Sequence, residues 1–333
     1  MLLGIETSCD ETSIAVLDKG CNVLSCVILS QDEIHKEWGG VFPELAARAH
    51  IERIRDVFDK AIYDARIKPK DISAIGVTCG PGLIGSLFVG LQFAKGLSLS
   101  LNVPFYGINH LDGHLSSSLI EHKDIPLPAI GLIVSGGHTE LVYIKNWGIY
   151  EVLGRTLDDA VGEAYDKVAR MLGLSFPGGP IIDKFAKNGR ANIKFPLPKI
   201  KKEGFDFSFS GLKTAVLYYI RENKDYVVSD VCASFQESAI NQLIIKIFSQ
   251  ASFKETKSIV VGGGVACNTR LREILEKEGN RKNIPVFIPS PRLCIDNGVM
   301  IAQVLARKIK AKEKSSSLFL SPVPNLHVFE TML

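Results

Sequence analysis

Two histidines one helical turn apart are the residues of this chain best suited to chemistry. His110 and His114 lie in the run NHLDGH (residues 109–114), directly after a strand-like segment. Four residues make about one helical turn, so both imidazoles would point the same way. Such a pair either holds a metal or bonds to backbone groups inside the protein, and a third ligand would decide. Asp296, in the run CIDNG (294–298), offers that ligand, and two histidines with one carboxylate leave coordination positions open for catalysis.

Glycine-rich loops form a second kind of candidate site. VSGGHT (134–139) lies between two predicted strands, where backbone N–H groups can approach an anion, although a tight hairpin would have the same sequence. GGGVACN (262–268) lies between a strand and a helix, and either a flat group or close helix-strand packing explains it. Gly178 and Gly179 precede Asp183, which could bind a ribose hydroxyl or belong to an N-terminal cap region. Neither VSGGHT nor GGGVACN matches the P-loop pattern or G-x-G-x-x-G, which argues against an ordinary kinase or dehydrogenase site at these loops.

Charged clusters are less specific. Four acids lie on one predicted helix, and Asp166, two turns inside it, is either a ligand or part of a solvated face. Basic residues crowd another helix and a proline-bearing loop, and such clusters are more often solvated surface than nucleic-acid sites. The acids are Asp158, Asp159, Glu163 and Asp166, and the basic residues are Arg48, His50, Arg53, Arg55, Lys194, Lys199, Lys201 and Lys202.

Length and composition indicate a globular protein with two domains. The 333 residues are 46% apolar and 23% charged, and a formal charge of +3 gives no general attraction to phosphates. Seven cysteines without a C-x-x-C pair favour a reducing compartment, and we expect a cytoplasmic protein. The N-terminus reads as a strand and not as a signal peptide. The apolar stretch 84–101 contains Gln92, Lys95 and three glycines, which argues against a transmembrane helix.

The predicted elements that would position these residues follow the order βββαβα twice. Alternating or continuous apolar runs indicate the strands, and apolar residues at three- and four-residue spacings indicate the helices. We expect the segment 188–204 to be a loop and the tail 311–333 to be loosely packed. In the first copy we predict strands at 2–7, 13–18, 23–30, 72–78 and 104–108, with helices at 43–65 and from about 86; in the second, strands at 129–135, 140–145, 149–153 and 258–261, with helices at 157–172, 231–251 and from about 268.

Six motifs, in order along nearly the whole chain, resemble those of the bacterial TsaD family. They are IETSCDET (5–12), GGVFPE (39–44), HLDGH (110–114), VSGGHT (134–139), FSFSGLKT (207–214) and CIDNG (294–298). The resemblance implies the α/β fold of the actin-like ATPase (ASKHA) superfamily, with two RNase H-like domains and a cleft between them. We expect residues 1–108 plus about 299–325 to form the N-terminal domain, and 109–298 to form the C-terminal domain with the metal and nucleotide site.

The resemblance also implies an enzyme, a tRNA N6-adenosine threonylcarbamoyltransferase. This acyltransferase moves the threonylcarbamoyl group from threonylcarbamoyl-AMP to the exocyclic amine of the adenosine beside the anticodon. The family holds one divalent metal, iron or zinc, and an adenylate donor or ATP. Archaeal counterparts carry a tyrosine where this chain has Ile133, so a fourth protein ligand is not implied. By resemblance the metal residues are His110, His114 and Asp296, which are catalytic together with Glu11, and the substrate or nucleotide residues are Ile133, Val134, Ser135, Gly136, Gly137, Asp166, Gly179, Asp183, Gly263 and Asn268.

Family members act with partners, and the resemblance carries those expectations too. The partners are tRNAs that read ANN codons, TsaB as a heterodimer, TsaE as an ATPase and the synthase that supplies the adenylate, with no membrane. We assign tRNA contacts to Arg48, Lys199, Lys201 and Lys202. Two other function classes stay open: a metalloprotease, although HLDGH lacks the glutamate of H-E-x-x-H, and a kinase, chaperone-like ATPase or non-catalytic ATP-binding scaffold of the same fold.

Overall fold

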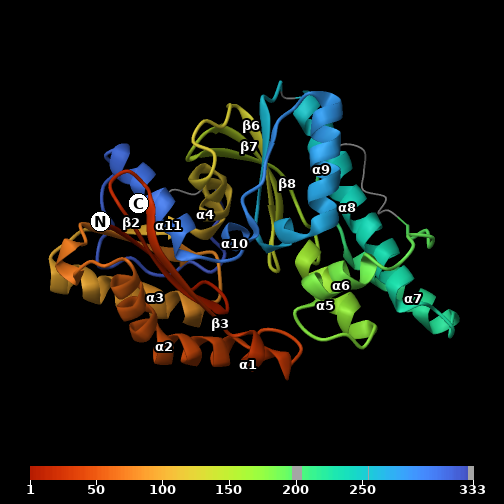
Figure 1. Cartoon of the computed structure of the whole chain (residues 1–333), viewed down its shortest axis with the longest axis horizontal. Coiled ribbons are helices and arrows are strands. Elements are labelled where there is room, and N and C mark those ends of the chain that lie inside the picture. Colours follow the sequence, from red (N-terminus) through yellow and green to blue (C-terminus); the bar gives the residue numbers. More distant parts are fainter. Residues whose placement is uncertain (197–204, 254, 329–333) are drawn as a thin grey trace. The chain divides into compact units, whose positions relative to one another are not determined.

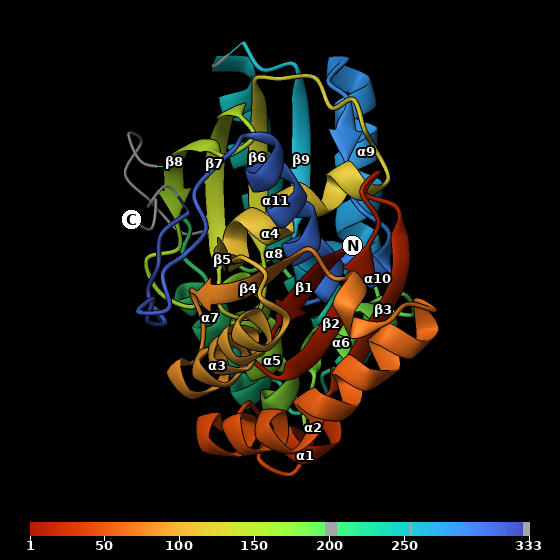
Figure 2. The same cartoon turned by 90° about the vertical axis from the view of Figure 1, so that its left-hand side faces the viewer.

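The protein forms two compact α/β units, each built on a five-stranded sheet. The computed structural model describes residues 1–196, 205–253 and 255–328. Unit 1 comprises Met1–Lys123 and Ile295–Leu333, and unit 2 comprises Asp124–Cys294. The strand orders are β3-β2-β1-β4-β5 in unit 1 and β10-β9-β6-β7-β8 in unit 2, and in both units three antiparallel strands are followed by two parallel ones (Figures 1 and 2). The predicted repeat of βββαβα is therefore confirmed.

Unit 1 has helices on both faces of its sheet, and both views show α11 on one face and α2 and α3 on the other (Figures 1 and 2). Every residue of β1 is buried, as expected for a strand covered on both faces. The elements are β1 (Leu2–Glu6), β2 (Glu11–Leu17), β3 (Val23–Ser30), α1 (Asp32–Lys36), α2 (Pro43–Asp64), η1 (Pro69–Asp71), β4 (Ala74–Gly80), α3 (Ile84–Leu101), β5 (Phe105–Asn109), α4 (His110–Ser116), η2 (Ser117–Ile120) and α11 (Gly298–Lys310).

The start of α11 lies unusually close to the sheet of unit 1. A Cβ added at Gly4 of β1 would lie 2.1 Å from the carbonyl oxygen of Gly298, so only glycine fits there. This close packing brings the chain just before α11 to the end of the sheet where β5 runs into α4, because α11 also packs on α4. The fold thus joins the two sequence-distant segments that carry His110 and Asp296.

Unit 2 packs its helices around the second sheet. Its core contains side chains of β6, β7 and β9 together with those of α5, α8 and α9. The elements are β6 (Ala129–Val134), β7 (Thr139–Asn146), β8 (Ile149–Arg155), α5 (Val161–Met171), α6 (Gly178–Ala186), α7 (Ser210–Glu222), α8 (Val228–Phe253), β9 (Ser258–Gly262), η3 (Gly264–Cys267), α9 (Thr269–Lys282), β10 (Val286–Phe287) and α10 (Pro291–Cys294).

One prediction about organisation was wrong and another was only partly right. The predicted domain boundary assigned the metal residues to the C-terminal domain, but they belong to unit 1, because β5 pairs with β4 and runs directly into α4. The tail, predicted to be loosely packed, is largely exposed over residues 311–325 but is anchored to unit 1 by individual contacts. Leu326 is 4% exposed, and Val323 N–H donates to the carbonyl of Cys79 at 2.7 Å. Much of the predicted loop 188–204 lies outside the described residues.

One helix in the described part of the chain, α3, has the length and apolar composition of a membrane span. Its 18 residues have a mean hydropathy of 1.3, and 28% of them are buried. Leu87, Leu91 and Ala94 pack in the core of unit 1, and Lys95 donates from Nζ to the carbonyl of Leu320 at 2.7 Å. These contacts make α3 a core helix of this unit.

Candidate functional site

The two histidines are presented by α4, whose start is fixed by a side-chain cap. Asn109, the last residue of β5, accepts hydrogen bonds from the N–H groups of Leu111 at 2.9 Å and Asp112 at 3.3 Å. This cap satisfies N–H groups that the first helical turn leaves without partners. His110 and His114 follow on one face of α4, with ring centroids 4.5 Å apart. The sequence motif therefore folds as its spacing predicts.

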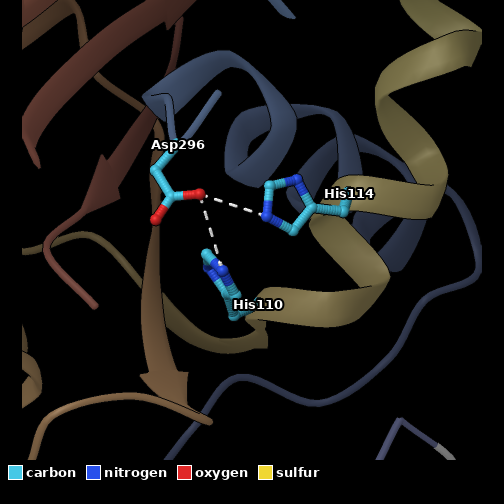
Figure 3. A group of neighbouring side chains, drawn as sticks. All are labelled: His110, His114 and Asp296. Carbon is cyan, nitrogen blue, oxygen red and sulfur yellow. Dashed lines mark ion pairs between the residues drawn. The ribbon is translucent and has the colours of Figure 1, made fainter. Parts of the chain in front are cut away.

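Asp296 reaches the same point from the chain before α11. Its Oδ1 lies 3.1 Å from Nε2 of His114 and 3.7 Å from Nε2 of His110 (Figure 3). Asn297 caps α11 by accepting from the N–H of Met300 at 3.0 Å, which fixes the backbone beside Asp296. The structure thus brings Asp296 to the two histidines, which lie more than 180 residues earlier in the chain.

The geometry of these three side chains fits a cation. Their donor atoms all lie within 4.8 Å of one another. Ligands held about 2.1 Å from one metal ion are about 3–3.4 Å apart, so the present separations need little adjustment. His114 is fully buried, yet among the described residues neither of its ring nitrogens has a hydrogen-bond partner. A buried imidazole without partners, aimed at a carboxylate, is what a metal ligand looks like when its ion is removed.

Behind His110 lies Glu6, a buried acid that sequence reasoning quoted only as part of a motif. Nδ1 of His110 lies 3.1 Å from Oε2 of Glu6 and 3.1 Å from Oγ of Ser8. Glu6 also accepts from Ser8 N–H and from Thr78 Oγ1, each at 2.5 Å. A proton on Nδ1 shared with a carboxylate leaves Nε2 free to bind a metal, the usual arrangement behind a histidine ligand. The signal in the sequence was an acid ending an otherwise apolar strand.

The carboxylates around His110 also set its protonation. Burial lowers the pKa of His110, but the negative charges of Asp296 and Glu6 and the Glu6 hydrogen bond outweigh it and raise the pKa to about 9. The site therefore attracts positive charge strongly. Without a cation, a proton on the ring supplies that charge.

Asp112, the acid between the histidines, makes structural contacts. It forms a bidentate ion pair with Arg307 of α11, in which Arg307 Nη1 donates to Asp112 Oδ1 at 3.0 Å, and it accepts from Ser116 Oγ at 3.1 Å. The pair ties α4 to α11, the two helices beside the ligands. Asp112 is thus engaged by a guanidinium and does not resemble the free base of a metalloprotease.

Glu11, expected to be catalytic, lies at the start of β2 in unit 1 and is half-buried. Burial raises its pKa well above the usual value, and the charges of Asp10, Asp296 and Asp32 add to the effect. Glu11 is thus part of an acidic environment near the metal residues. Its catalytic role stays a prediction.

In unit 2 the two glycine loops leave the same edge of the sheet. Parallel strands β6 and β9 pair with Ile133 opposite Gly262, so the loops after them are neighbours. Gly263 has φ +101°, and a Cβ there would lie 2.3 Å from the carbonyl oxygen of Val134. Close backbone packing, one of the two alternatives for this loop, is therefore observed at Gly263.

The VSGG loop itself is open. Ser135 N–H donates to the carbonyl of His138 at 2.8 Å and Ser135 Oγ accepts from His138 N–H at 3.0 Å, which closes the turn. Gly136 and Gly137 are exposed, and a Cβ on either would meet nothing within 4 Å. Both the tight hairpin and an accessible backbone are present, so this loop remains a candidate anion-binding site.

The acids of unit 2 hold helix starts in place. Asp166 Oδ1 accepts from Gly178 N–H at 2.7 Å at the beginning of α6, and Asp183 accepts from Thr269 Oγ1 at 3.0 Å at the beginning of α9. Asn268 caps α9 by accepting from Leu271 N–H at 2.9 Å and donates to Gln236 Oε1 at 2.7 Å. Gly179 is open, since a Cβ there would meet nothing within 4 Å. The predicted nucleotide residues thus gather around α6 and α9 with structural bonds of their own.

The helix before these acids begins later than predicted, which changes two assignments. Because α5 starts at Val161, Asp158 and Asp159 precede it and do not lie on the predicted helix. Asp158 accepts from Phe209 N–H at 2.8 Å and from Ser208 Oγ at 2.5 Å, so it orders the FSFSG motif. Asp159 pairs with Lys167 and Lys213, each at 2.6 Å.

The predicted basic patch on α2 is smaller than its sequence suggests. His50 is fully buried, and its Nδ1 lies 2.7 Å from Thr12 Oγ1. Burial lowers its pKa, so it is neutral and not part of the surface charge. Arg55 is paired with Asp59 at 2.8 Å, while Arg48 is exposed. The predicted contacts Lys199, Lys201 and Lys202 lie outside the described residues.

Comparisons with known proteins agree with this arrangement. The model of the TsaD family, described as tRNA N6-adenosine threonylcarbamoyltransferase, matches residues 22–303. A protein of that name from Clostridium kluyveri is 48% identical over 335 residues, covering 99% of this chain and 98% of the relative. Another from Dictyoglomus turgidum is 47% identical over 328 residues, covering 97% of this chain and 98% of the relative.

Solved structures of actin-like ATPase fold share the architecture at low identity. HypF from T. kodakarensis superposes with a TM-score of 0.63 at 15% identity, covering 93% of this chain and 47% of that one. Component A of the Acidaminococcus fermentans (R)-2-hydroxyglutaryl-CoA dehydratase gives 0.56 at 13% identity, covering 93% of this chain and 98% of that one. These likenesses show the fold alone, and the predicted actin-like class is confirmed.

Proposed function

Because the chain belongs to the TsaD family of tRNA N6-adenosine threonylcarbamoyltransferases, we propose that it transfers the threonylcarbamoyl group from threonylcarbamoyl-AMP to N6 of the adenosine beside the anticodon in tRNA. The observation that carries the proposal is the convergence of His110, His114 and Asp296 on one point. These residues come from two of the motifs that the chain shares with the family. An adenine amine is a weak nucleophile, so much of the acceleration must come from positioning and from stabilising charge.

The proposed cofactor is one divalent metal ion, iron or zinc. His110 and His114 would bind it through Nε2 and Asp296 through a carboxylate oxygen, a set that leaves positions open. Such an ion supplies positive charge that can polarise donor oxygens. Glu6 would hold the Nδ1 proton of His110, so that Nε2 is the ring nitrogen left to the ion.

The chain's own groups in unit 2 suit an adenylate. The exposed backbone at Gly136 and Gly137 offers N–H donors to a phosphate or carbonyl oxygen without steric hindrance. Asp183, already ordered by Thr269, would accept from ribose hydroxyls, with Gly179 leaving space beside it. Asp166, Gly263 and Asn268 act by building this region: Asp166 holds the start of α6, Gly263 permits the close packing, and Asn268 caps α9. The expected tasks of these residues remain proposals on this basis.

The macromolecular partners follow from the same family. The substrate would be a tRNA that reads ANN codons, and its target base must leave the stack to reach a catalytic centre, which costs a few kcal/mol. Arg48 is the described cation we assign to tRNA binding. We propose TsaB and TsaE as protein partners, an upstream synthase as the source of the donor, and the cytoplasm as the location.

The contacts of Asp112 argue against the metalloprotease alternative. A metalloprotease needs a carboxylate that can take a proton from water beside the ion. The acid of HLDGH is instead paired with Arg307. No specific observation favours a sugar kinase or a chaperone-like ATPase.

The test is reconstitution of the complete reaction. The protein is incubated with labelled threonine, bicarbonate, ATP, the adenylate-forming synthase, the partner proteins and unmodified tRNA, and label in the tRNA is counted. We expect label that depends on this chain and falls to background with Asp296→Ala. Asp59→Asn, on the exposed side of α2, serves as the control and should leave the label unchanged. Transfer at the wild-type rate by Asp296→Ala, or none with the wild-type chain in the full mixture, would refute the proposal.

A further inference from the structure

Two cysteines of unit 2, outside the residues used above, form a contact pair. Cys267 ends η3 and Cys294 ends α10, two short helical turns that pack on each other. Their side chains are neighbours, although 26 intervening residues separate them in the chain. Cys267 Sγ also donates to the carbonyl of Pro291 at 3.4 Å, and Cys294 Sγ to that of Pro289 at 3.3 Å. Both sulfurs are therefore held in defined positions beside each other.

A guanidinium group lies beside the pair and contacts Cys294. Arg272 Nη2 donates to Cys294 Sγ at 3.2 Å, and its Nε donates to the carbonyl of Ala266 at 2.7 Å. The arginine is thereby fixed beside the turn that carries Cys267. Positive charge near a sulfur stabilises its thiolate, which is the nucleophilic form of cysteine.

Cys267 differs from the buried cysteines of the chain. The neighbouring Cys294 thiol lowers the pKa of Cys267, the Arg272 charge acts in the same direction, and burial opposes both. Burial instead raises the pKa of Cys79 and of Cys232. Cys267 is also only half-buried, whereas Cys294 is completely buried. One accessible, activated thiol beside one sheltered thiol is the arrangement of a redox-reactive pair.

We propose that Cys267 and Cys294 are a site of reversible oxidation, in which a peroxide converts the pair to a disulfide. The Cys267 thiolate attacks one peroxide oxygen, so that an S–O bond forms, the O–O bond breaks and hydroxide leaves, giving a sulfenic acid. The Cys294 sulfur then attacks the Cys267 sulfur, the S–O bond breaks, and water leaves with the Cys294 proton. With hydrogen peroxide the sum is two thiols and one peroxide giving one disulfide and two waters.

The place of the pair gives the oxidation a structural consequence. Cys267 directly precedes Asn268, the cap of α9, and Cys294 lies two residues before Asp296 in the chain. A disulfide is about 2.05 Å long, so the two sulfurs must move from non-bonded contact to bonding distance. The bond would tie the GGGVACN loop to the CIDNG segment. The proposal itself does not depend on the proposed transfer reaction.

The test is a peroxide titration of the full-length, reduced protein. Remaining thiols are alkylated under non-reducing conditions, and peptides are identified by mass spectrometry. We expect a Cys267–Cys294 disulfide that dithiothreitol reverses and that forms at least fivefold faster than exposed Cys26 is oxidised. Cys26→Ser is the matched control and should not change this rate. Cys294→Ser should instead leave a sulfenic acid on Cys267 that dimedone traps.

A second measurement needs no variant and no oxidation. Phenylarsine oxide binds two neighbouring thiols at once, so the reduced wild-type protein should bind one equivalent with loss of the Cys267 and Cys294 thiols together. If Cys267 and Cys294 both still react with the alkylating reagent after peroxide has oxidised Cys26, the proposal is overturned. If bound phenylarsine oxide does not protect Cys267 and Cys294 from alkylation, the proposal is overturned as well.

Discussion

Replacing Glu6 by glutamine tests how the protein prepares His110 for a metal. Glu6 offers two acceptor oxygens to three donors: Oε1 to Ser8 N–H, and Oε2 to Thr78 Oγ1 and His110 Nδ1. An amide has one oxygen and one NH₂ group, so one acceptor position must become a donor. At the Oε1 position the NH₂ would face a backbone N–H only 2.5 Å away. The NH₂ therefore turns toward Nδ1 of His110.

That orientation favours the wrong tautomer of His110. An NH₂ group facing Nδ1 moves the ring proton to Nε2, the atom aimed at Asp296. Ser8 Oγ, 3.1 Å from Nδ1, can still accept a hydrogen bond from Nδ1–H, which limits the shift of the ring proton to Nε2. Loss of such a supporting carboxylate typically costs 10- to 100-fold in metal affinity, or about 1.4–2.8 kcal/mol. Ser8→Ala removes only the neutral partner and should cost about 0.5–1 kcal/mol.

The assay is competition for Zn²⁺ between metal-free protein and a chromogenic chelator at one fixed pH. Circular dichroism checks that each variant is folded. We expect Glu6→Gln to bind at least tenfold more weakly than wild type, and Ser8→Ala to lie between them. A folded Glu6→Gln variant that binds Zn²⁺ within twofold of wild type would refute the reasoning.

Three further predictions concern other parts of the chain. Gly263→Ala should lower the free energy of unfolding in urea by about 1–3 kcal/mol, because φ at this position is +101° and the new Cβ would collide with the backbone of Val134. Gly264→Ala should change this free energy little, because a Cβ at Gly264 would meet no atom within 4 Å. Equal losses of stability in the two variants would contradict this reasoning. Arg48→Ala should weaken tRNA binding and reduce the salt slope by about 1, while Arg55→Ala, already paired with Asp59, should have less effect; identical salt slopes for wild type and Arg48→Ala would remove Arg48 from the interface. Burial raises the pKa of Asp159, but the hydrogen bonds and charges of Lys167 and Lys213 outweigh burial, so the pKa is lowered in the folded protein. The ion pairs therefore stabilise the fold above the unfolded pKa of about 3.9, and this stabilisation is lost as the pH falls through the folded pKa. Asp159→Asn should therefore lose about 1 kcal/mol at pH 7 and less at pH 3, and an equal loss at both would count against the ion pairs.

The double βββαβα repeat was predictable because each strand and helix carries its own local pattern. In both units, apolar runs and amphipathic spacing indicate the element order, whereas the sheet orders contain pairs of strands far apart in sequence, β1 with β4 and β6 with β9, that these patterns do not predict. Element ends were less predictable. The start of α5 was placed too early because acids such as Asp158 are common in first helical turns, whereas here Asp158 binds the backbone of a distant motif.

Contacts between distant segments were the hardest part to predict. The side-by-side histidines follow from helical spacing, but Asp296 was placed with them through family resemblance, since periodicity says nothing about long-range contacts. The tail was misjudged because its polar composition conceals backbone bonds such as that from Val323 to Cys79. Glu6 was missed as the partner of His110 because only the fold places β1 beside α4.

Metal content tests the central claim most directly. Metal-free protein is loaded with Fe²⁺ under anaerobic conditions or with Zn²⁺, passed over a desalting column and measured by elemental mass spectrometry. One ion per chain is predicted for wild type and for His122→Ala, a histidine control in the same unit. Less than about a tenth of that is predicted for His114→Ala and for Asp296→Ala, since each removes one of the three ligands found among the described residues. A folded Asp296→Ala protein that still retains one ion per chain would contradict the account.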